Sequence, residues 1–269
     1  MINTLKNKYL MMKDAFLKFV FFISLFFPAS ISLFAESKPN SPYQFAWLSD
    51  IHIAGSENKS VKELRTSVSD INSNKNIRFT IITGDIADFG EDSVLELAKS
   101  ILDSLRMPYY IVPGNHDTKW SESGATAFNC IFGHHNISFN YGNIEFIGFQ
   151  VGPILRRGAG YISPDDLAWV KAQCEQARKQ GRIIIPFDHY PLTQSRDMSN
   201  GYKLTSLFRE YYVPLILSGH WHRYRLIKAG GIPDVVTRTN RTNFGGGNLI
   251  GYTIVKVADD SMYFYKREP

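Results

Sequence analysis

Five short segments of the chain share one arrangement, an apolar run that ends in side chains able to bind a metal ion or move a proton. The segments are residues 48–52, 81–85, 109–117, 185–189 and 216–222. An apolar run that stops at Pro or Gly predicts a buried strand ending at a turn. Side chains at the carboxyl ends of such strands lie where open α/β sheets bind ligands. The recurrence therefore predicts one site that all five segments build together.

The histidines follow the same distribution. Five of the seven in the chain fall within these segments, each beside or near an Asp, Asn or Gly. A single histidine is more often a core or surface residue than a ligand, but that interpretation does not explain five of them at strand ends. His134 and His135 lie outside the segments, and we interpret both as structural residues.

The donor set suits metal ions bound through nitrogen and oxygen. Asp50 and His52 are two residues apart, and Asp85 follows a glycine that lets the backbone approach an ion closely. Donors without a thiolate favour Mn, Fe, Zn, Co or Ni over a closed structural zinc site. Two ions about 3.5–4 Å apart, bridged by a carboxylate, are used for attack on phosphorus. The candidate metal ligands are Asp50, His52, Asp85, Asn115, His189, His220 and His222.

His116 is adjacent to a candidate ligand, and a different role is expected for it. A histidine that projects toward the substrate can act as general acid for a leaving alkoxide. Asp88, three residues after Asp85, could orient the ring of His116, as carboxylates orient imidazoles elsewhere. A capping or turn carboxylate is the alternative interpretation of Asp88. Asp117 is expected to fix the turn rather than to touch substrate.

The five segments together resemble the calcineurin-like metallophosphoesterase superfamily. The motifs Asp-x-His, Gly-Asp-x-x-Asp, Gly-Asn-His-Asp, His and Gly-His-x-His follow one another in this order across residues 45–222. The resemblance implies one ion held by Asp50, His52, Asp85 and His222, and a second held by Asp85, Asn115, His189 and His220. It also implies a metal-bridging hydroxide that attacks phosphorus, with His116 assisting the leaving group.

Departures from the family pattern narrow the branch. Asp88 stands where purple acid phosphatases have Tyr, and Phe89 stands where protein Ser/Thr phosphatases have Arg. His116 stands where lipid A pathway hydrolases have Arg. Tyr190 replaces the second residue of the usual His-His-Pro and leaves the preceding ligand intact. The chain is thus similar to the small bacterial branch that includes cyclic-nucleotide and other phosphodiesterases, within which substrates vary.

Hydrophobic periodicity predicts alternating strands and helices, and hence a parallel sheet with right-handed crossovers. Strands are expected at 43–48, 78–83, 109–112, 182–187 and 213–217, a hairpin at 137–149, and helices at 59–71, 92–105, 164–180 and 204–211. Four more strands follow near 224–228, 234–237, 249–257 and 262–265. A second sheet would use the hairpin and these C-terminal strands. The expected fold is α/β, a two-sheet β-sandwich flanked by helices in four αββα layers, with a dinuclear metal site at the strand C-terminal ends.

Residues 1–35 have the layout of a secretory signal peptide. Lysines precede a short apolar core at 19–27, and a small residue, Ala35, precedes a polar stretch. The core is shorter than the roughly 20 residues of a spanning helix, and Pro28 interrupts it. An uncleaved N-terminal membrane anchor is the alternative. We therefore expect an exported protein, periplasmic or secreted, in which residues 41–269 form the metallophosphoesterase domain.

Composition argues against a nucleic-acid partner. The 269-residue chain is 44% hydrophobic, which suits one large α/β domain, and carries a formal charge of +5. Four lysines and one aspartate in the signal segment account for +3 of this charge, which leaves a nearly neutral domain. No basic track with interleaved aromatic residues is present to indicate a nuclease. Cys130 and Cys174 belong to no metal motif and are interpreted as structural or free.

Arginine and aromatic side chains near the motifs could contact a substrate. Arginines suit phosphate recognition, although a solvated surface is the simpler interpretation of each one. The arginines are Arg156, Arg157, Arg223, Arg225, Arg238 and Arg241. Tyr190, Trp221 and Phe244 could stack on a base or aromatic leaving group, or pack at the rim of the core.

The predicted function is an exported metal-dependent phosphoesterase that hydrolyses small phosphodiesters or phosphomonoesters. Its cofactors would be two divalent or trivalent metal ions and its partner a small phosphate ester, with membrane contact only through an uncleaved anchor. The oligomeric state stays open. The alternative is a catalytically silent metal-binding or interaction protein on the same fold. Loss of a ligand would have favoured that alternative, and every expected ligand is present.

Overall fold

The computed structural model describes residues 41–55, 58–119, 121, 123, 126–152, 159–193, 197–244, 249–258 and 261–269. The predicted signal segment, Arg156 and Arg157 lie outside these residues. Within them, no helix has the length and apolar character that crossing a membrane requires.

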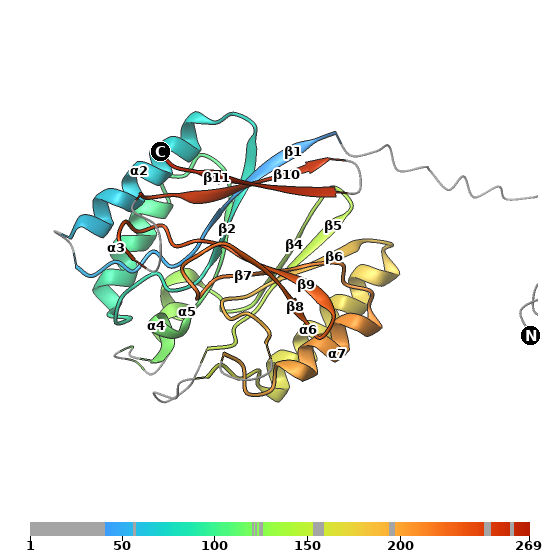
Figure 1. The fold of residues 1–269 in the computed structure, drawn as a ribbon. Coiled ribbons are helices and arrows are strands. Elements are labelled where there is room, and N and C mark those ends of the chain that lie inside the picture. Colours follow the sequence, from blue (N-terminus) through green and yellow to red (C-terminus); the bar gives the residue numbers. More distant parts are fainter. Residues whose placement is uncertain are drawn as a thin grey trace, which may run out of the picture. The chain divides into compact units, whose positions relative to one another are not determined.

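Sheet 1 has five strands in the order β11-β10-β1-β2-β3 (Figure 1). Its strands are β1 (Tyr43–Leu48), β2 (Ile77–Thr83), β3 (Tyr109–Val112), β10 (Tyr252–Ala258) and β11 (Ser261–Arg267). The first three are parallel, as the sequence predicts, while β10 runs antiparallel to β1 and β11 antiparallel to β10. The carboxyl ends of β1, β2 and β3 therefore meet at one edge of the sheet.

Sheet 2 has six strands in the order β4-β5-β6-β7-β9-β8. Its strands are β4 (Ile137–Tyr141), β5 (Ile144–Gly148), β6 (Ile183–Phe187), β7 (Ile216–Ser218), β8 (Arg225–Ala229) and β9 (Ile232–Val236). The predicted hairpin forms β4 and β5, and β5, β6, β7 and β9 are parallel. The carboxyl ends of β6 and β7 supply the remaining two motifs.

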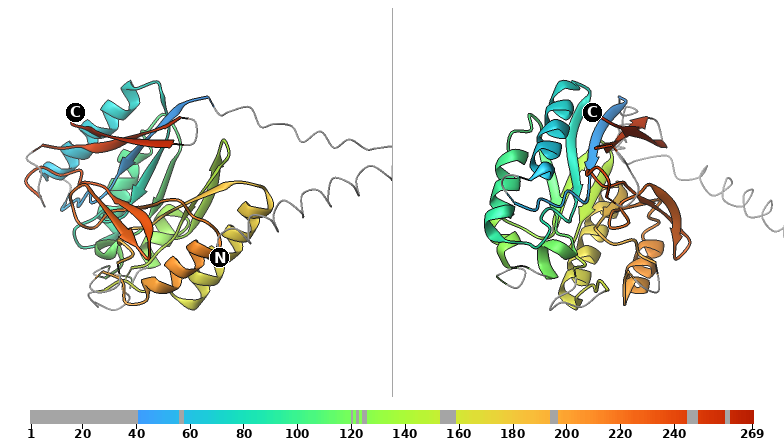
Figure 2. Two further views of the ribbon diagram at one scale, coloured as in Figure 1. Left: turned by 45° about the vertical axis from the view of Figure 1, so that its right-hand side comes forward. Right: turned by 60° about the vertical axis from the view of Figure 1, so that its left-hand side comes forward.

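Helices cover the outer face of each sheet (Figures 1 and 2). The helices are α2 (Lys59–Ser73), α3 (Asp92–Leu102), α4 (Asn115–Lys119), α5 (Thr126–Phe132), α6 (Pro164–Lys179) and α7 (Gly201–Glu210). One apolar cluster joins α2, α3 and α5 to sheet 1, and another joins α6 and α7 to sheet 2. A third cluster lies between the two sheets. The four-layer αββα architecture is thus confirmed.

Local sequence signals account for where the helices begin. Asn58 caps α2, its side chain accepting a hydrogen bond from the backbone N–H of Ser60. Ser163 caps α6 in the same way, accepting from Asp166 N with Pro164 at the first helical position. The short helices α4 and α5 were not expected, because α4 consists of the motif residues themselves and five residues show too little periodicity.

The core between the sheets fixes the strands that lead to the site. Phe45 of β1 stacks on Phe79 of β2 with ring centroids 4.9 Å apart, and Phe146 of β5 meets Phe45 edge to face. Trp47 is fully buried and donates a hydrogen bond from Nε1 to Thr83 Oγ1 at 3.0 Å. These contacts hold the ends of β1 and β2 in register, directly before the first two motifs.

The C-terminal strands depart from the prediction. They do not all join the second sheet, since only β8 and β9 do so while β10 and β11 extend sheet 1. Without β10, the edge of β1 would leave a row of unpaired backbone groups. Pairing with β10 satisfies that edge from Tyr43↔Val257 to Trp47↔Thr253. Both cysteines are free, with Cys130 exposed and Cys174 buried.

Candidate metal centre

Five strand ends converge on one edge of the sandwich and bring the predicted ligands together. Asp50 and His52 follow β1, Asp85 follows β2, and Asn115 begins α4 after β3. His189 follows β6, and His220 and His222 follow β7. All seven side chains that the sequence nominated thus lie at the same edge.

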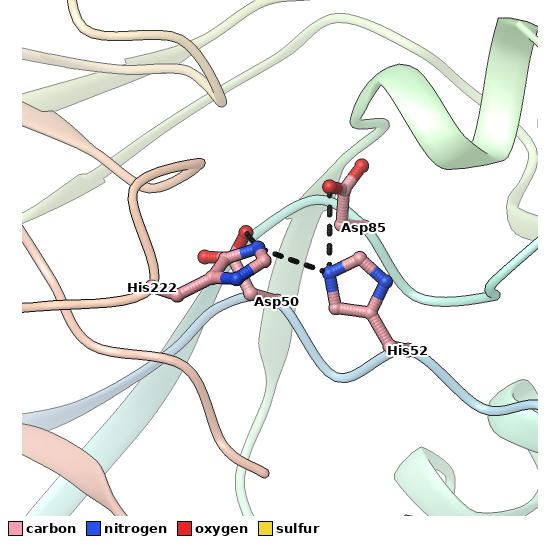
Figure 3. A group of neighbouring side chains, drawn as sticks. All are labelled: Asp50, His52, Asp85 and His222. Atoms are coloured by element: carbon pink, nitrogen blue, oxygen red, sulfur yellow. Dashed lines mark hydrogen bonds and ion pairs between the residues drawn. The ribbon is translucent and has the colours of Figure 1, made fainter. Parts of the chain in front are cut away.

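The first grouping, here called the Asp50 grouping, consists of Asp50, His52, Asp85 and His222. One donor atom from each side chain lies within 4.8 Å of the others. The Nε2 atoms of His52 and His222 are 3.2 Å apart, and His222 Nε2 is 3.3 Å from Asp50 Oδ1. Figure 3 shows the four side chains pointing toward a common centre.

The second grouping, here called the His189 grouping, consists of Asp85, His189 and His220, again within 4.8 Å. His189 Nε2 lies 3.2 Å from Asp85 Oδ2 and 3.0 Å from the side-chain oxygen of Asn115. Asp85 belongs to both groupings, which is the position that a bridging carboxylate needs. The structure therefore brings together both ligand sets implied by the sequence resemblance.

The backbone at the centre is held in an unusual conformation. Among the described residues, seven other than glycine have positive φ, and five of these are candidate ligands: Asp50, His52, Asp85, His220 and His222. This left-handed conformation is costly for residues with a Cβ, and such strain gathers at functional sites where the surroundings enforce it. Asp50 N donates to Gly84 O at 3.0 Å and His52 N to Asp85 O at 2.9 Å. Those bonds fix the first two exit loops to each other.

Two glycines permit this close approach of the loops. A Cβ on Gly114 would lie 2.2 Å from Asp85 Oδ1, and a Cβ on Gly219 would lie 2.1 Å from Ser49 Oγ. Both distances are far below van der Waals contact. The glycine that precedes the Asn-His-Asp motif and the one that precedes the last His motif are therefore required by packing against the centre.

The charges and open donor atoms of the centre fit metal ions. Asp50 Oδ1 and Asp85 Oδ2 are buried, and in the described part of the chain each lacks a well-formed hydrogen bond and faces the Nε2 atom of a candidate ligand, His222 at 3.3 Å and His189 at 3.2 Å. Burial alone would raise the pKa of Asp85, but His189 and His52 hold that pKa well below its usual range. Burial also opposes charge on His189, yet Asp85 and Asp50 raise its pKa to about 10. Buried carboxylates with this demand for positive charge suit a cation.

His116 lies beside the Asp50 grouping on the first turn of α4. Its backbone N–H donates to Asp85 Oδ1 at 2.8 Å, and its ring centroid is 4.7 Å from that of His52. Its Nδ1 lies 2.6 Å from the backbone carbonyl oxygen of Asp88. Burial lowers the pKa of His116, and Asp85 partly offsets the effect.

The carboxylate of Asp88 has a partner other than the predicted one. It lies 3.0 Å from Nδ1 of His52, on the side of that ring opposite the centre, and 3.5 Å from Arg241 Nη1. The ring of His116 is held by the carbonyl oxygen of Asp88 instead. Sequence spacing predicted Asp88 beside His116 only, and the contact of its carboxylate with His52 follows from the loop conformation.

Asp117 fixes the exit loops, as predicted. Its Oδ1 accepts hydrogen bonds from Ile86 N and Ala87 N at 2.9 and 3.0 Å, and its Oδ2 accepts from Gly114 N at 2.8 Å.

His135, outside the site, contacts the Asn129 side chain with Nδ1 and lies 3.4 Å from Asp166 with Nε2. That histidine is structural, as expected.

Sequence reasoning nominated Arg241 and Phe244 in the loop that follows β9, but it overlooked Thr239 and did not predict that this loop supports the backbone of the centre. Thr239 Oγ1 donates to the carbonyl oxygen of Asp50 at 2.6 Å, and Arg241 Nη1 donates to that of His52 at 3.2 Å. Phe244 stacks on His222, with ring centroids 4.6 Å apart. Because β9 is parallel to β7, its polar exit loop reaches the same edge. A search for strand ends followed by any polar run, rather than by Asp or His, would have found it.

The nominated arginines and aromatic residues divide into three kinds. Arg223 and Arg225 are exposed, whereas Arg238 is buried and pairs with Glu268 at 2.8 Å. Tyr190 is buried against the His220 ring at 4.3 Å and so packs rather than stacks on a ligand. Phe244 contacts the ring of His222, while Arg241 contacts the backbone carbonyl oxygen of His52 and the carboxylate of Asp88.

Comparison with known proteins agrees with the site. The sequence matches the calcineurin-like phosphoesterase family over residues 43–224. It is 26% identical over 201 residues to YvnB of Bacillus subtilis, covering 67% of this chain and 15% of that protein. It is 25% identical over 196 residues to a 3',5'-cyclic-nucleotide phosphodiesterase of Nostoc sp., covering 68% of this chain and 72% of that protein. A dimetal phosphatase from Danio rerio shares its fold, with TM-score 0.68, 16% identity and coverage of 84% and 96%.

The fold and the metal-ligand edge are those of a phosphoester hydrolase with metal-binding side chains. The chain belongs to the calcineurin-like phosphoesterase family, since the family match covers more than half of its length.

Proposed function

We propose that this protein is a metal-dependent phosphodiesterase acting on small phosphate esters, with two metal ions in the centre. The observation that carries the proposal is the convergence of seven nitrogen and oxygen donors on one edge, with Asp85 shared by two groupings. Five of those donors are held in a strained backbone conformation, which indicates that the fold maintains them for function.

Each residue of the centre has a distinct role in this proposal. Asp50, His52, Asp85 and His222 would hold one ion, and Asp85, Asn115, His189 and His220 the other. Bound ions in such a site polarise the phosphoryl oxygens and lower the pKa of bound water. Asp88 orients His52 through Nδ1, and Thr83 orients His189 through its carbonyl oxygen, 2.7 Å from Nδ1. These contacts leave Nε2 of each ring for the ion.

His116 is the proposed general acid. Nδ1 faces the Asp88 carbonyl oxygen at 2.6 Å, which orients the ring, and Nε2 is the nitrogen that we propose protonates the leaving group. A positioned histidine contributes about 10²–10⁴-fold to such a reaction. Burial lowers the pKa of the ring, which makes the protonated form a stronger acid and also reduces the fraction of the ring that is protonated at neutral pH.

The preference for a diester rests on relatives and on a departure in the sequence. The relative from Nostoc sp. is named as a phosphodiesterase. Phe89 occupies the position after Asp88 where protein phosphatases of the family carry an arginine. Small diesters are therefore the substrate class that we favour, with the metals drawn from Mn, Fe, Zn, Co and Ni.

The test compares bis(p-nitrophenyl) phosphate with p-nitrophenyl phosphate for protein loaded in turn with Mn, Fe, Zn, Co or Ni. We expect metal-dependent hydrolysis with higher kcat/KM for the diester. Preference for the monoester would overturn the assignment as a diesterase, while the broader assignment as a phosphoesterase would still hold. A metal-loaded protein that hydrolyses neither ester would favour a binding or interaction role on the same fold.

Replacement of His116 tests its role as acid. His116→Ala should lower kcat by about 10²–10⁴-fold for a diester with an alkyl leaving group and by much less for a p-nitrophenyl leaving group, which needs little protonation. His135→Ala, outside the centre, is the matched control and should change neither rate. An equal loss for both leaving groups would show that His116 positions the substrate instead.

We also propose that the protein is exported, on the layout of residues 1–35. Its N-terminus after expression in a bacterial host, determined by mass spectrometry, should begin shortly after Ala35. An intact N-terminus in the membrane fraction would favour the anchored alternative.

A further inference from the structure

An apolar groove opens at one side of the sandwich, between strands β6, β8 and β9 of sheet 2 and strands β10 and β11 of sheet 1. Its volume is about 600 Å³. Leu226 and Val235 line it from sheet 2, and Val257, Met262 and Phe264 line it from sheet 1. Cavities of this size take small organic ligands, and their lining is usually apolar.

A second cavity, of about 330 Å³, lies next to this groove on the side of the metal centre. Tyr224 and Phe264 line both cavities, so the two adjoin at these side chains. The second cavity also reaches His222, which is a candidate metal ligand. A ligand in the groove would therefore extend toward the same edge as the catalytic centre.

Strand directions give the groove its orientation. Because β10 is antiparallel to β1 and β11 to β10, the pair Thr253↔Lys266 lies at the metal edge and the pair Val257↔Met262 at the far end. Four residues of strand separate the two pairs, about 13 Å at the rise of a β-strand. The groove thus runs along the strands, away from the metal centre.

The two ends of the groove differ in charge. At the metal end it is lined by Arg223, Arg238 and Lys266, of which the last two share the single carboxylate of Glu268. That leaves an excess of positive charge beside the centre. At the far end the lining is apolar apart from its rim, where the Arg178 guanidinium lies 5.6 Å over the exposed Tyr212 ring.

The apolar surface of the groove is open to solvent at its outer wall. Leu226 of the edge strand β8 is 64% exposed, although its cross-strand partner Val235 is buried. An exposed apolar groove rimmed by polar residues marks a binding site more often than a plain surface. Its position next to the cavity that His222 and the cationic side chains line points to a ligand with an anionic head and an apolar chain.

We propose that the groove binds the apolar chain of an amphiphilic phosphoester whose phosphate lies at the metal centre. The inference rests on the proposed function and names its substrate class. The cations at the head end attract the phosphate, and the walls formed by Leu226, Val235, Val257 and Met262 remove the chain from water.

The first test is a series of alkyl p-nitrophenyl phosphodiesters from methyl to octyl, kept below the concentration at which they form micelles. For the wild type, kcat/KM should rise with chain length, by at most about fourfold per methylene buried. The measured quantity is the ratio of kcat/KM for octyl over methyl, because the amount of folded enzyme cancels in it.

Leu226→Glu places a charge in the groove wall and should reduce this ratio at least tenfold, with Leu226→Ala giving a smaller reduction. Tyr263→Glu is the matched control, because Tyr263 is similarly exposed on the neighbouring edge strand β11 but does not line the groove. The control should keep the wild-type ratio. The proposal would be overturned if kcat/KM of the wild type did not change with chain length, or if Leu226→Glu had the same octyl-to-methyl ratio as the wild type. Either result would leave the assignment as a phosphoesterase intact.

A binding measurement separates this proposal from the proposed catalysis. Octylphosphonate should bind the metal-loaded protein more tightly than methylphosphonate in isothermal titration calorimetry, with a more negative heat-capacity change that Leu226→Glu diminishes. This result would support the groove even for a protein that turns over neither ester. Equal affinity for both phosphonates, together with a change of oligomeric state in Leu226→Glu, would assign the groove to contact between copies of the chain.

Discussion

The two halves of the metal centre are supported in different ways. In the Asp50 grouping, Nδ1 of His52 faces the half-buried carboxylate of Asp88, which also lies 3.5 Å from Arg241. In the His189 grouping, Nδ1 of His189 faces a neutral carbonyl oxygen, that of Thr83, at 2.7 Å. A carboxylate orients an imidazole and also raises its basicity, whereas a carbonyl oxygen chiefly orients it.

The buried residues that support the two halves differ as well. Behind His189 lie two fully buried carboxylates, Asp188 and Asp234. Burial, reinforced by Asp234, raises the pKa of Asp188 well above its usual range, and burial raises that of Asp234 to about 7. Asp234 is held by Ser218 Oγ at 2.6 Å and by Leu192 N at 3.0 Å. The His189 grouping is thus supported by buried acids that favour their protonated form.

This difference indicates a division of labour within one centre. The Asp50 grouping depends on a charged neighbour that also borders the proposed acid His116. The His189 grouping depends on backbone and on buried packing. Substitutions should therefore separate the two halves, except at Asp85, where they meet.

The largest effect is expected at the shared residue. Asp85→Asn removes the carboxylate common to both groupings and should lower kcat/KM by about 10³-fold or more, since a metal-held charge contributes several kcal/mol to the transition state. Bound metal, measured by inductively coupled plasma mass spectrometry, should fall below two ions per chain. Two retained ions would show that Asp85 does not bridge them.

A smaller and one-sided effect is expected at Asp88. Asp88→Asn keeps the size of the side chain and removes the charge beside His52, so metal affinity should fall by about 10–100-fold for one ion only. Titration of metal-free protein with Mn or Zn should then resolve two affinities that differ more than in the wild type. An equal loss of affinity for both ions would show that Asp88 does not support the Asp50 grouping alone.

The smallest effect concerns stability and the buried acid behind His189. Because the folded-state pKa of Asp234, about 7, is higher than the usual 3.8, the folded protein retains a proton that the unfolded chain loses. Its contribution to stability is complete below about pH 4 and is lost as pH rises toward 7, at about 1.4 kcal/mol per pH unit. Above pH 7 it no longer changes.

Asp234→Asn should remove this dependence. The unfolding free energies of wild type and variant are measured by urea denaturation at several pH values with EDTA present. Between pH 4 and 7, the unfolding free energy of the wild type should fall relative to that of the variant. Asp165→Asn, on the exposed first turn of α6, is a control whose difference should stay flat in that range. A flat difference for Asp234→Asn would show that its carboxyl is ionised in the folded protein.

Short-range signals explain why much of the site was predictable. Strand β1 was predicted with the bounds that the structure shows, and β4 begins where the predicted hairpin begins, because each is an apolar run bounded by polar or turn residues. The candidate ligands follow such strands directly. Parallel strands bring their carboxyl ends to one edge, so convergence of those residues followed from topology alone.

Contacts between segments far apart in sequence were not predictable in the same way. The assignment of β10 and β11 to sheet 1 depends on the open edge of β1, about 200 residues away, which periodicity does not report. The partners of Asp88 and the contact of Thr239 with Asp50 depend on loop conformations of similar origin.

The sequence by itself determined the αββα sandwich, the family resemblance and the identity of the candidate metal ligands, because strand pattern and residue order are local properties. Only the tertiary structure decided which atoms face the centre, which strands close each sheet, and that an apolar groove along β10 and β11 adjoins the cavity at His222. Those features arise where separate segments pack, and packing depends on shape and on buried contacts that no single stretch of sequence contains.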